Sequence, residues 1–338
     1  MRAMIGDPYS PYKVLHWSRR LRKIAGGGIP SPVTVMIDPT NACSYRCIFC
    51  SSAGAPRGAS LSLEQMTGLI GEASDLGAQG VTFAGGGDPL DNPATPRAIS
   101  EAYDTYMETG IITNGYMLKE PAMMEAAKQC RWVRISIAAG TEKTYRELMH
   151  PPRDASLEAL ARHAEELRGA GVHVTVSYLA QKPNIGEIGE AAGIFAAAAQ
   201  ITVRPAYRLT PATQPPGPSD LPAVEKQARE AQERGINVQI CTDRFLGTPP
   251  NPSCLAAPLL AVCQADGNIP VCCHKRYQPA YYIGNFLEAP LNEIWGSERH
   301  REALESVNPS ACHHCRYGKY AEIIEKCYID DDMHRCFI

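Results

Sequence analysis

The sequence lacks any run of apolar residues that approaches a membrane span, and its N-terminus lacks the charged-then-apolar pattern of a secretory signal. It also has little net charge, because the formal value of −3 predicts no global attraction to nucleic acid or to a membrane surface. The 338 residues, 44% of them hydrophobic and 20% charged, show no sign of disorder or of a fibrous repeat. We therefore expect a cytoplasmic, globular protein with one large core or two and no membrane partner.

Cysteine, by contrast, is abundant, with 13 residues. In a small secreted protein that number would indicate disulfides. The absence of a secretory signal favours a reducing cytoplasm, where cysteines more often bind metals. Most of them fall in two groups, one near residue 45 and one after residue 250, and each group is a candidate metal site.

The first group is Cys43-Ser44-Tyr45-Arg46-Cys47-Ile48-Phe49-Cys50, which follows a β-like apolar run at residues 33–38. It supplies three thiols and lacks a fourth. Because a closed structural site needs four ligands, three thiolates in one loop can hold a metal centre that keeps one position open for chemistry. Two other interpretations of the triplet are a zinc knuckle completed by a distant ligand and a disulfide-bearing loop.

The triplet, followed downstream by Gly85-Gly86-Gly87-Asp88-Pro89, resembles the radical S-adenosylmethionine (SAM) superfamily. The resemblance implies that Cys43, Cys47 and Cys50 hold a 4Fe-4S cluster whose fourth iron is chelated by SAM. It also implies that a reductant such as flavodoxin or ferredoxin supplies the electron for cleavage of SAM to a 5'-deoxyadenosyl radical. That radical then abstracts a hydrogen atom from the substrate.

The same resemblance implies which residues contact SAM. The glycines resemble the motif that bonds the SAM amino group, with Gly-Gly-Asp-Pro here in place of the usual Gly-Gly-Glu-Pro. Phe49 is expected against the adenine, Asn114 belongs to a Thr-Asn-Gly turn common in the family, and Ser136 is expected at the ribose or carboxylate. Asn-Gly is also a general turn signal, and inward strand residues can be purely structural. The candidate SAM contacts are Phe49, Gly85, Gly86, Gly87, Asp88, Asn114, Ser136 and Arg204.

An alternation of strand-like and helix-like patterns predicts an α/β fold. Strands alternating with crossover helices require a parallel sheet, and several of the helices begin at a good N-cap such as Ser62 or Ser156. Six such units are too few for a complete TIM barrel and match the open (β/α)6 partial barrel of radical SAM enzymes. The β-like runs are residues 33–38, 80–84, 110–113, 132–137, 172–179 and 201–208.

We divide the chain into an N-terminal extension at 1–32, a radical SAM partial barrel at 33–245 and a small cysteine-rich domain at 246–338. The extension contains a basic stretch at residues 19–23. We expect it to form a solvated helix that closes the bottom of the barrel, and the alternative is a contact for a phosphate-bearing partner.

The second cysteine group resembles the SPASM and twitch domains, which hold auxiliary iron–sulfur clusters. On that pattern the ligands of one auxiliary 4Fe-4S cluster are Cys254, Cys272, Cys312 and Cys315. A full SPASM domain holds two clusters, but the cysteine expected next is absent, since position 321 is alanine. A zinc ribbon is the rival interpretation of this region. The cysteines that could supply a second cluster are Cys263, Cys327 and Cys336.

The substrate class stays open at this stage, and no catalytic residue is assigned beyond the SAM machinery. A carbohydrate or aminocyclitol fits the twitch-like cysteine spacing, and a peptide fits many SPASM enzymes, although no separate recognition domain is evident at the N-terminus. Nucleic acid, such as a modified thymidine in phage DNA, would use basic residues at 19–23, 275–276 and 316–319. A metal-stapled binding protein is the non-catalytic alternative, and it would neither bind nor cleave SAM.

Overall fold

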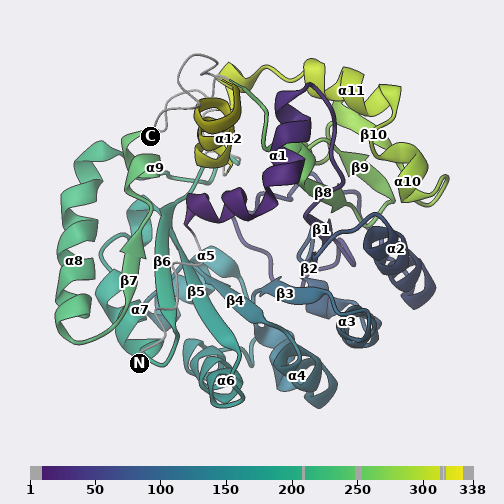
Figure 1. Cartoon of the computed structure of the whole chain (residues 1–338). Helices are drawn as coiled ribbons and strands as arrows, with labels where there is room; N and C mark the ends of the chain where they lie inside the picture. The colour runs from purple at the N-terminus through teal and green to yellow at the C-terminus, as the bar shows by residue number, and fades with distance from the viewer. Residues whose placement is uncertain (1–9, 208–209, 248–252, 313–314, 316, 330–338) are drawn as a thin grey trace, which may run out of the picture.

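The computed structural model describes residues 10–207, 210–247, 253–312, 315 and 317–329. Its centre is an eight-stranded sheet in the order β7-β6-β5-β4-β3-β2-β1-β8, in which every neighbouring pair is parallel (Figure 1). All six predicted barrel strands are present as β1 to β6, so the partial barrel is confirmed. The strands are β1 (Thr34–Ile37), β2 (Gly80–Phe83), β3 (Glu108–Thr113), β4 (Trp132–Ile137), β5 (His173–Ala180), β6 (Gln200–Pro205), β7 (Val238–Ile240) and β8 (Leu260–Cys263).

Helices connect successive strands β1 to β7, as parallel pairing requires. Side-chain caps fix where two of them begin, because Ser62 Oγ accepts a hydrogen bond from Gln65 N and Ser156 Oγ accepts one from Ala159 N, each at 3.1 Å. These helices are α2 (Leu63–Asp75), α3 (Thr95–Asp104), α4 (Pro121–Lys128), α5 (Glu142–Met149), α6 (Leu157–Gly169), α7 (Ile188–Ile194) and α8 (Leu221–Glu233), and α9 (Thr242–Leu246) follows β7.

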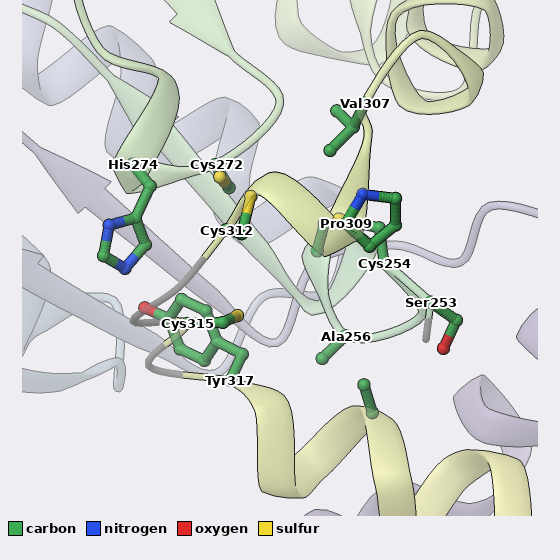
Figure 2. A pocket seen from close by; sticks show the side chains of 12 residues that line it. Ser253, Cys254, Ala256, Cys272, His274, Val307, Pro309, Cys312, Cys315 and Tyr317 are labelled. Carbon is green, nitrogen blue, oxygen red and sulfur yellow. The ribbon is translucent and has the colours of Figure 1, made fainter. Parts of the chain in front are cut away.

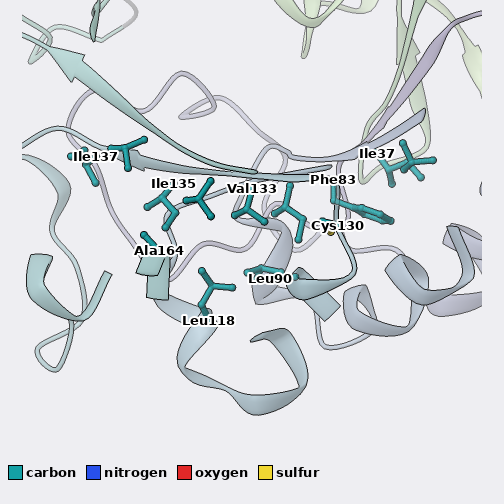
Figure 3. Close-up of a cluster of buried hydrophobic side chains, with 14 of the residues drawn as sticks. Ile37, Phe83, Leu90, Leu118, Cys130, Val133, Ile135, Ile137 and Ala164 are labelled. Carbon is teal, nitrogen blue, oxygen red and sulfur yellow. The ribbon is translucent and has the colours of Figure 1, made fainter. Parts of the chain in front are cut away.

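The main core lies between the sheet and these helices (Figure 3). In β4, Val133, Ile135 and Ile137 are buried on the helix side of the sheet. Successive side chains of a strand point to opposite faces, so Arg134 and Ser136 face the interior of the barrel. The apolar positions thus build the fold, while the alternate positions line the space available to a ligand.

Strand β8 comes from the cysteine-rich region, where the sequence analysis predicted no strand. It pairs in parallel with β1, and Cys263 lies opposite Ile37. The region after residue 245 is therefore built onto the barrel beside the strand that leads into the first cysteine group. The division into three domains stays a prediction.

Helix α5 was also missing from the sequence-based prediction. It begins after Thr141, whose Oγ1 accepts a hydrogen bond from Thr144 N at 3.3 Å. Its residues Tyr145, Leu148 and Met149 are buried, a spacing that places them on one side of the helix. The cap and this spacing are the sequence signals that would have found the helix.

The remaining elements belong to the C-terminal region. Leu291 N donates to Glu72 Oε2 at 2.6 Å, and Trp295 Nε1 donates to Pro30 O at 2.8 Å, so this region is bound both to α2 and to the N-terminal extension. Its elements are β9 (Asn268–Pro270), β10 (Tyr282–Asn285), α10 (Leu291–Ile294), α11 (Glu298–Glu305) and α12 (Gly318–Ile324).

The N-terminal extension forms helix α1 (Ser18–Ala25), which lies beside α12 (Figure 1). Leu21 and Ile24 pack with residues of α12 in a second, smaller core. Arg20 donates to Gly77 O at 2.5 Å, at the turn that leads into β2. The predicted helix is present, but one of its faces is packed rather than solvated. None of the described helices is long and apolar enough to cross a membrane.

Candidate functional site

The first cysteine group forms a loop after β1, and contacts from α5 hold it in place. Ile48 N donates to Leu148 O at 3.1 Å, and Cys47 Sγ lies 3.6 Å from Met149 O. The hydroxyls of Tyr45 and Tyr145 are hydrogen-bonded to each other in the buried contact between loop and helix. Burial raises the pKa of Tyr145 to about 12, so this pair stays neutral and acts as an anchor.

A second anchor comes from the loop after β2. The backbone N–H of Ser44 donates to Asp91 Oδ2 at 2.7 Å, and the Ser44 hydroxyl also hydrogen-bonds this carboxylate. On the other side, Thr210 Oγ1 donates to Ile48 O at 2.8 Å. The loop that carries the three thiols is therefore fixed at its start and near its end before any metal binds.

The three thiols lie close enough to influence one another. Cys43 is exposed as a residue, but the neighbouring chain removes water from its thiol, and this desolvation, followed by the charge of Asp88, raises its pKa to about 12. Burial with the charges of Cys43 and Cys50 raises the pKa of Cys47. Among the described residues, no three His, Cys, Asp or Glu side chains lie close enough together to bind a single metal ion. A 4Fe-4S cluster places each thiolate on a different iron, and its positive charge would favour the thiolate forms.

Asp88 ties the loops after β2 and β3 together. Its carboxylate accepts hydrogen bonds from Leu90 N at 3.0 Å, Thr113 Oγ1 at 2.9 Å and Asn114 N at 2.5 Å, and its side chain is buried. Burial raises its pKa to about 6, although these donors oppose the shift. The side chain of Asp88 thus positions the motif, and the backbone N–H groups of Gly87 and Asp88 bind it to Thr40 O and Ala42 O, each at 2.9 Å.

Asn114 connects the third loop to the first cysteine. Its Nδ2 donates to Cys43 Sγ at 3.7 Å, and its Oδ1 accepts from Tyr116 N at 2.8 Å, which fixes the orientation of the amide. Hydrogen bonds to cluster sulfurs help to set a cluster's reduction potential. The Thr-Asn-Gly turn therefore lies next to a predicted cluster ligand, and the contact of Asn114 with SAM stays a prediction.

The glycine motif packs tightly against the chain that leads to the cysteines. A Cβ on Gly87 would lie 1.8 Å from Ala42 O, and one on Gly86 would lie 2.0 Å from Asn41 Oδ1, so neither position can carry a side chain without movement. Gly85 has a φ of 151°, which favours glycine. Asn41 Oδ1 is buried without a hydrogen-bond partner among the described residues. An acceptor in this position fits a ligand that donates a hydrogen bond, as the SAM amino group would.

The other predicted SAM contacts lie around the same end of the barrel or inside it. Phe49 is partly buried against the core. Ser136 on β4 lies opposite Ser177 of β5, and Arg204 on β6 lies opposite Leu179. For Phe49, Ser136 and Arg204, contact with SAM stays a prediction.

The four predicted auxiliary ligands line one pocket in the C-terminal region, together with His274 and Tyr317 (Figure 2). Burial, followed by the charges of Cys315 and Cys312, raises the pKa of Cys254 to about 11. The four thiols therefore come together from three separate segments of the chain, which supports a common metal centre. The four are Cys254, Cys272, Cys312 and Cys315.

The three further cysteines do not join this pocket as described. Cys263 lies on β8 and is completely buried in the main core. Cys327 is exposed, in the π-helix Glu325–Ile329 after α12. Cys336 lies outside the described residues. The structure thus brings together the four predicted ligands of one auxiliary cluster, and a second cluster stays a prediction.

The basic residues proposed for nucleic acid do not form one free surface. Arg276, whose side chain is 16% exposed, forms an ion pair with the buried Asp38, with Nη2 to Oδ1 at 2.8 Å, and Lys319 pairs with Asp243 at 2.5 Å. Arg20 is bound to the Gly77 carbonyl. Arg316 lies outside the described residues. The predicted phosphate-binding role is wrong for Arg276, because its guanidinium is largely buried and already paired with the Asp38 carboxylate.

Comparison with known proteins identifies two regions of the chain. Residues 37–192 match the Radical SAM superfamily, and residues 254–316 match SPASM, an iron–sulfur cluster-binding domain. The PqqA peptide cyclase of Streptomyces rochei is 25% identical over 297 residues, which is 82% of this chain and 79% of that protein. The mycofactocin maturase MftC of Mycobacterium ulcerans is 29% identical over 54% of this chain and 50% of that protein.

The match to the PqqA peptide cyclase of Granulibacter bethesdensis, at 27% identity, covers 46% of this chain and 42% of that protein, so the chain spans less than half of this relative. Among solved structures, Streptococcus suis SuiB bound to its precursor peptide SuiA has a TM-score of 0.69 at 17% identity, over 96% of this chain and 81% of that chain. The structure of anSMEcpe with bound AdoMet has a TM-score of 0.60 at 14% identity, over 89% and 91%. These structures share the fold. Together with the cysteine loop after β1 and the cysteine pocket of the C-terminal region, the matches show a radical SAM region at residues 37–192 and a SPASM iron–sulfur cluster-binding domain at residues 254–316, and these imply SAM and iron–sulfur clusters as cofactors.

Proposed function

We propose that this radical SAM enzyme modifies a peptide. The observation that carries the proposal is the similarity to the Streptomyces rochei PqqA peptide cyclase, which extends over 82% of this chain and includes both the barrel and the C-terminal region. A second maturase, MftC, is similar over 54% of the chain. The shared fold with SuiB, solved with a precursor peptide, agrees with the proposal.

When bound at the first cysteine group, the cluster and SAM supply a 5'-deoxyadenosyl radical that removes a hydrogen atom from the substrate. The chain's own residues prepare the site for this chemistry. Tyr45 and Tyr145 hold the cysteine loop against α5, Asp88 joins the second and third loops, and Asn114 donates its N–H to Cys43. Because these contacts exist before the substrate arrives, the reacting groups are preorganised.

The interior of the barrel offers polar groups to a peptide. Ser136 and Arg134 project inward from β4, and Arg204 projects inward from β6. The Arg134 guanidinium also lies 5.8 Å from the Trp132 ring centroid, which restricts its orientation. Arginine binds carboxylates and carbonyls well, and a peptide presents both groups. We infer that Arg134 orients the peptide segment that loses its hydrogen atom, beside Ser136 and Arg204, for which the predicted partner is SAM.

The auxiliary pocket is assigned to an iron–sulfur cluster held by Cys254, Cys272, Cys312 and Cys315. When bound, such a cluster supplies either an acceptor for an electron released by the substrate or a fixed contact that positions the substrate. An oxidative reaction would require the acceptor role, whereas a redox-neutral rearrangement would need only the contact.

The test is an anaerobic reaction of reconstituted protein with SAM, dithionite and candidate precursor peptides taken from short reading frames beside its gene. We expect 5'-deoxyadenosine to form in proportion to a modified peptide. Mass spectrometry would show the loss of two hydrogens for an oxidative cross-link. A peptide whose mass is unchanged in ordinary water, but which gains one deuterium when the reaction runs in heavy water, would indicate epimerisation.

The control is the triple variant Cys43→Ala, Cys47→Ala, Cys50→Ala, which should form neither product while its auxiliary iron remains. Cleavage of SAM that is stimulated by an aminocyclitol or by DNA, and by none of the peptides, would contradict the peptide assignment. Zinc in place of iron, with no SAM cleavage, would contradict the enzymatic assignment as a whole.

A further inference from the structure

Residues 272–278 connect the auxiliary pocket to the first cysteine group. Cys272 lines that pocket, and further along the segment Arg276 reaches the carboxyl end of β1. There its Nε and Nη2 each donate to the carboxylate of Asp38 at 2.8 Å, and Asp38 has no exposed area. This ion pair fixes the position of the next residue, Tyr277.

Tyr277 places its hydroxyl against the glycine motif. A Cβ added to Gly86 would lie 2.2 Å from the Tyr277 hydroxyl oxygen and 2.0 Å from Asn41 Oδ1, so these two atoms meet at one point of the motif. Both are buried, and neither has a hydrogen-bond partner in the described part of the chain. Burial and then the Asp38 carboxylate raise the pKa of Tyr277, whereas the Arg276 charge and a weak interaction with the Ser52 side chain lower it. The Ser52 contact falls outside good hydrogen-bond geometry and leaves the hydroxyl able to take a better partner. A donor from outside the chain would satisfy both oxygens.

The chemistry of these atoms indicates which ligand group they would bind. Asn41 Nδ2 donates to Pro56 O at 2.9 Å, which turns Oδ1 toward Gly86, and this oxygen can only accept. The charged groups that act on the Tyr277 hydroxyl are the carboxylates of Asp38 and Asp266 and the guanidinium of Arg276, so two negative charges face one positive charge and the surroundings favour a further positive charge. The α-ammonium of SAM is a donor with that charge. We propose that Tyr277, a residue of the C-terminal region, binds the SAM α-ammonium together with Asn41.

The backbone of Tyr277 supports this assignment. Its φ of 58° lies in the left-handed region, which is rare for a bulky side chain. The conformation is held from both sides, by the Arg276–Asp38 pair and by the bond from Tyr277 N to Gln264 Oε1 at 3.1 Å. Such strain is found where a functional group must be aimed. The C-terminal region therefore completes the SAM site in addition to holding an auxiliary cluster.

The test measures SAM binding rather than turnover, on the anaerobically reconstituted full chain by isothermal titration calorimetry. Tyr277→Phe removes the hydroxyl and keeps the ring that packs on Gly86. We expect the SAM dissociation constant to rise about tenfold, as for the loss of a hydrogen bond to a charged group, with unchanged iron per chain. Tyr281→Phe is the matched control, since Tyr281 follows this segment and its ring lies 4.1 Å from Lys275 Nζ. The SAM dissociation constant of this variant should stay within about twofold of the unchanged protein.

A second ligand makes the test specific to the ammonium. 5'-Methylthioadenosine lacks the amino acid part of SAM, so Tyr277→Phe should leave its affinity unchanged. An unchanged SAM affinity, an equal loss for methylthioadenosine, an equal loss in Tyr281→Phe, or a loss of iron from Tyr277→Phe would each overturn the proposal. None of these measurements uses a substrate, so they are independent of the peptide assignment.

Discussion

Replacing Arg276 tests how the C-terminal region is attached to the barrel. Arg276→Met removes both 2.8 Å bonds to the Asp38 carboxylate and the 2.9 Å contact with Met36 Sδ. Asp38 is completely buried, and it would then lack its cation. Removing one partner of a buried ion pair costs about 3–5 kcal/mol, so we expect a loss of that size in the free energy of unfolding.

The assay is urea denaturation under anaerobic conditions, followed by far-UV circular dichroism. Asp38→Asn combined with Arg276→Met removes both charges. This double variant should recover most of the free energy of unfolding that Arg276→Met loses, because no unpaired charge is then left in the interior. Lys143→Met serves as the control, since Lys143 has 82% of its side chain exposed and should change stability by no more than about 0.5 kcal/mol.

The pH dependence of the same variant follows from the Asp38 carboxyl. Burial raises the pKa of Asp38, and the Arg276 guanidinium opposes that shift in the native protein. Without Arg276 the Asp38 carboxyl stays protonated in the folded state, whereas it loses its proton above about pH 4 in the unfolded chain. The loss in the free energy of unfolding caused by Arg276→Met should therefore grow as the pH rises from about 5 to about 7.5. A penalty below about 1 kcal/mol at about pH 7.5, or a double variant less stable than the single one, would refute this reasoning.

Three further predictions follow from other contacts. Cys312→Ala with Cys315→Ala should remove about four irons per chain and leave the SAM-cleaving cluster assembled, as shown by iron analysis with the 5'-deoxyadenosine assay; loss of SAM cleavage would contradict separate sites. Asn114→Ala removes the N–H that contacts Cys43 Sγ at 3.7 Å and should make the cluster's reduction potential more negative in a redox titration followed by electron paramagnetic resonance, whereas an unchanged potential would argue against the contact. Burial lowers the pKa of His300 to about 4, so the unfolded chain takes up its proton first and stability should fall by about 2 kcal/mol from about pH 7.5 to about pH 5. His300→Gln should abolish that part of the slope, and an identical slope in the variant would exclude His300 as its source.

Local patterns were sufficient to predict the barrel and the position of the first cysteine group within it. The β strands are short, buried runs separated by capped helices, and both signals are contained within a few neighbouring residues. The cysteine triplet and the glycine motif are also local, which is why their placement after β1 and β2 followed from the strand order. The second cysteine group was predicted as a set because its resemblance includes the spacing between its segments.

Contacts between distant segments could not be predicted in the same way. Arg276 and Asp38 are separated by 238 positions, and nothing in the basic run around Arg276 indicates that it is buried. Tyr277 reaches Gly86 only because that ion pair and an unusual φ direct it there. Strand β8 is four residues long, and a run of that length does not reveal which sheet it joins.

The pairing of β8 with β1 has a consequence for how the protein is made. β1 acquires β2 as its first neighbour early in synthesis, but its other edge stays unpaired until Leu260–Cys263 has left the ribosome. An unpaired edge is a site of aggregation, and this one belongs to the strand that carries the cysteine loop. Chains that end before residue 260 would leave that edge open, so the last third of the sequence protects the nascent barrel as well as supplying cysteines.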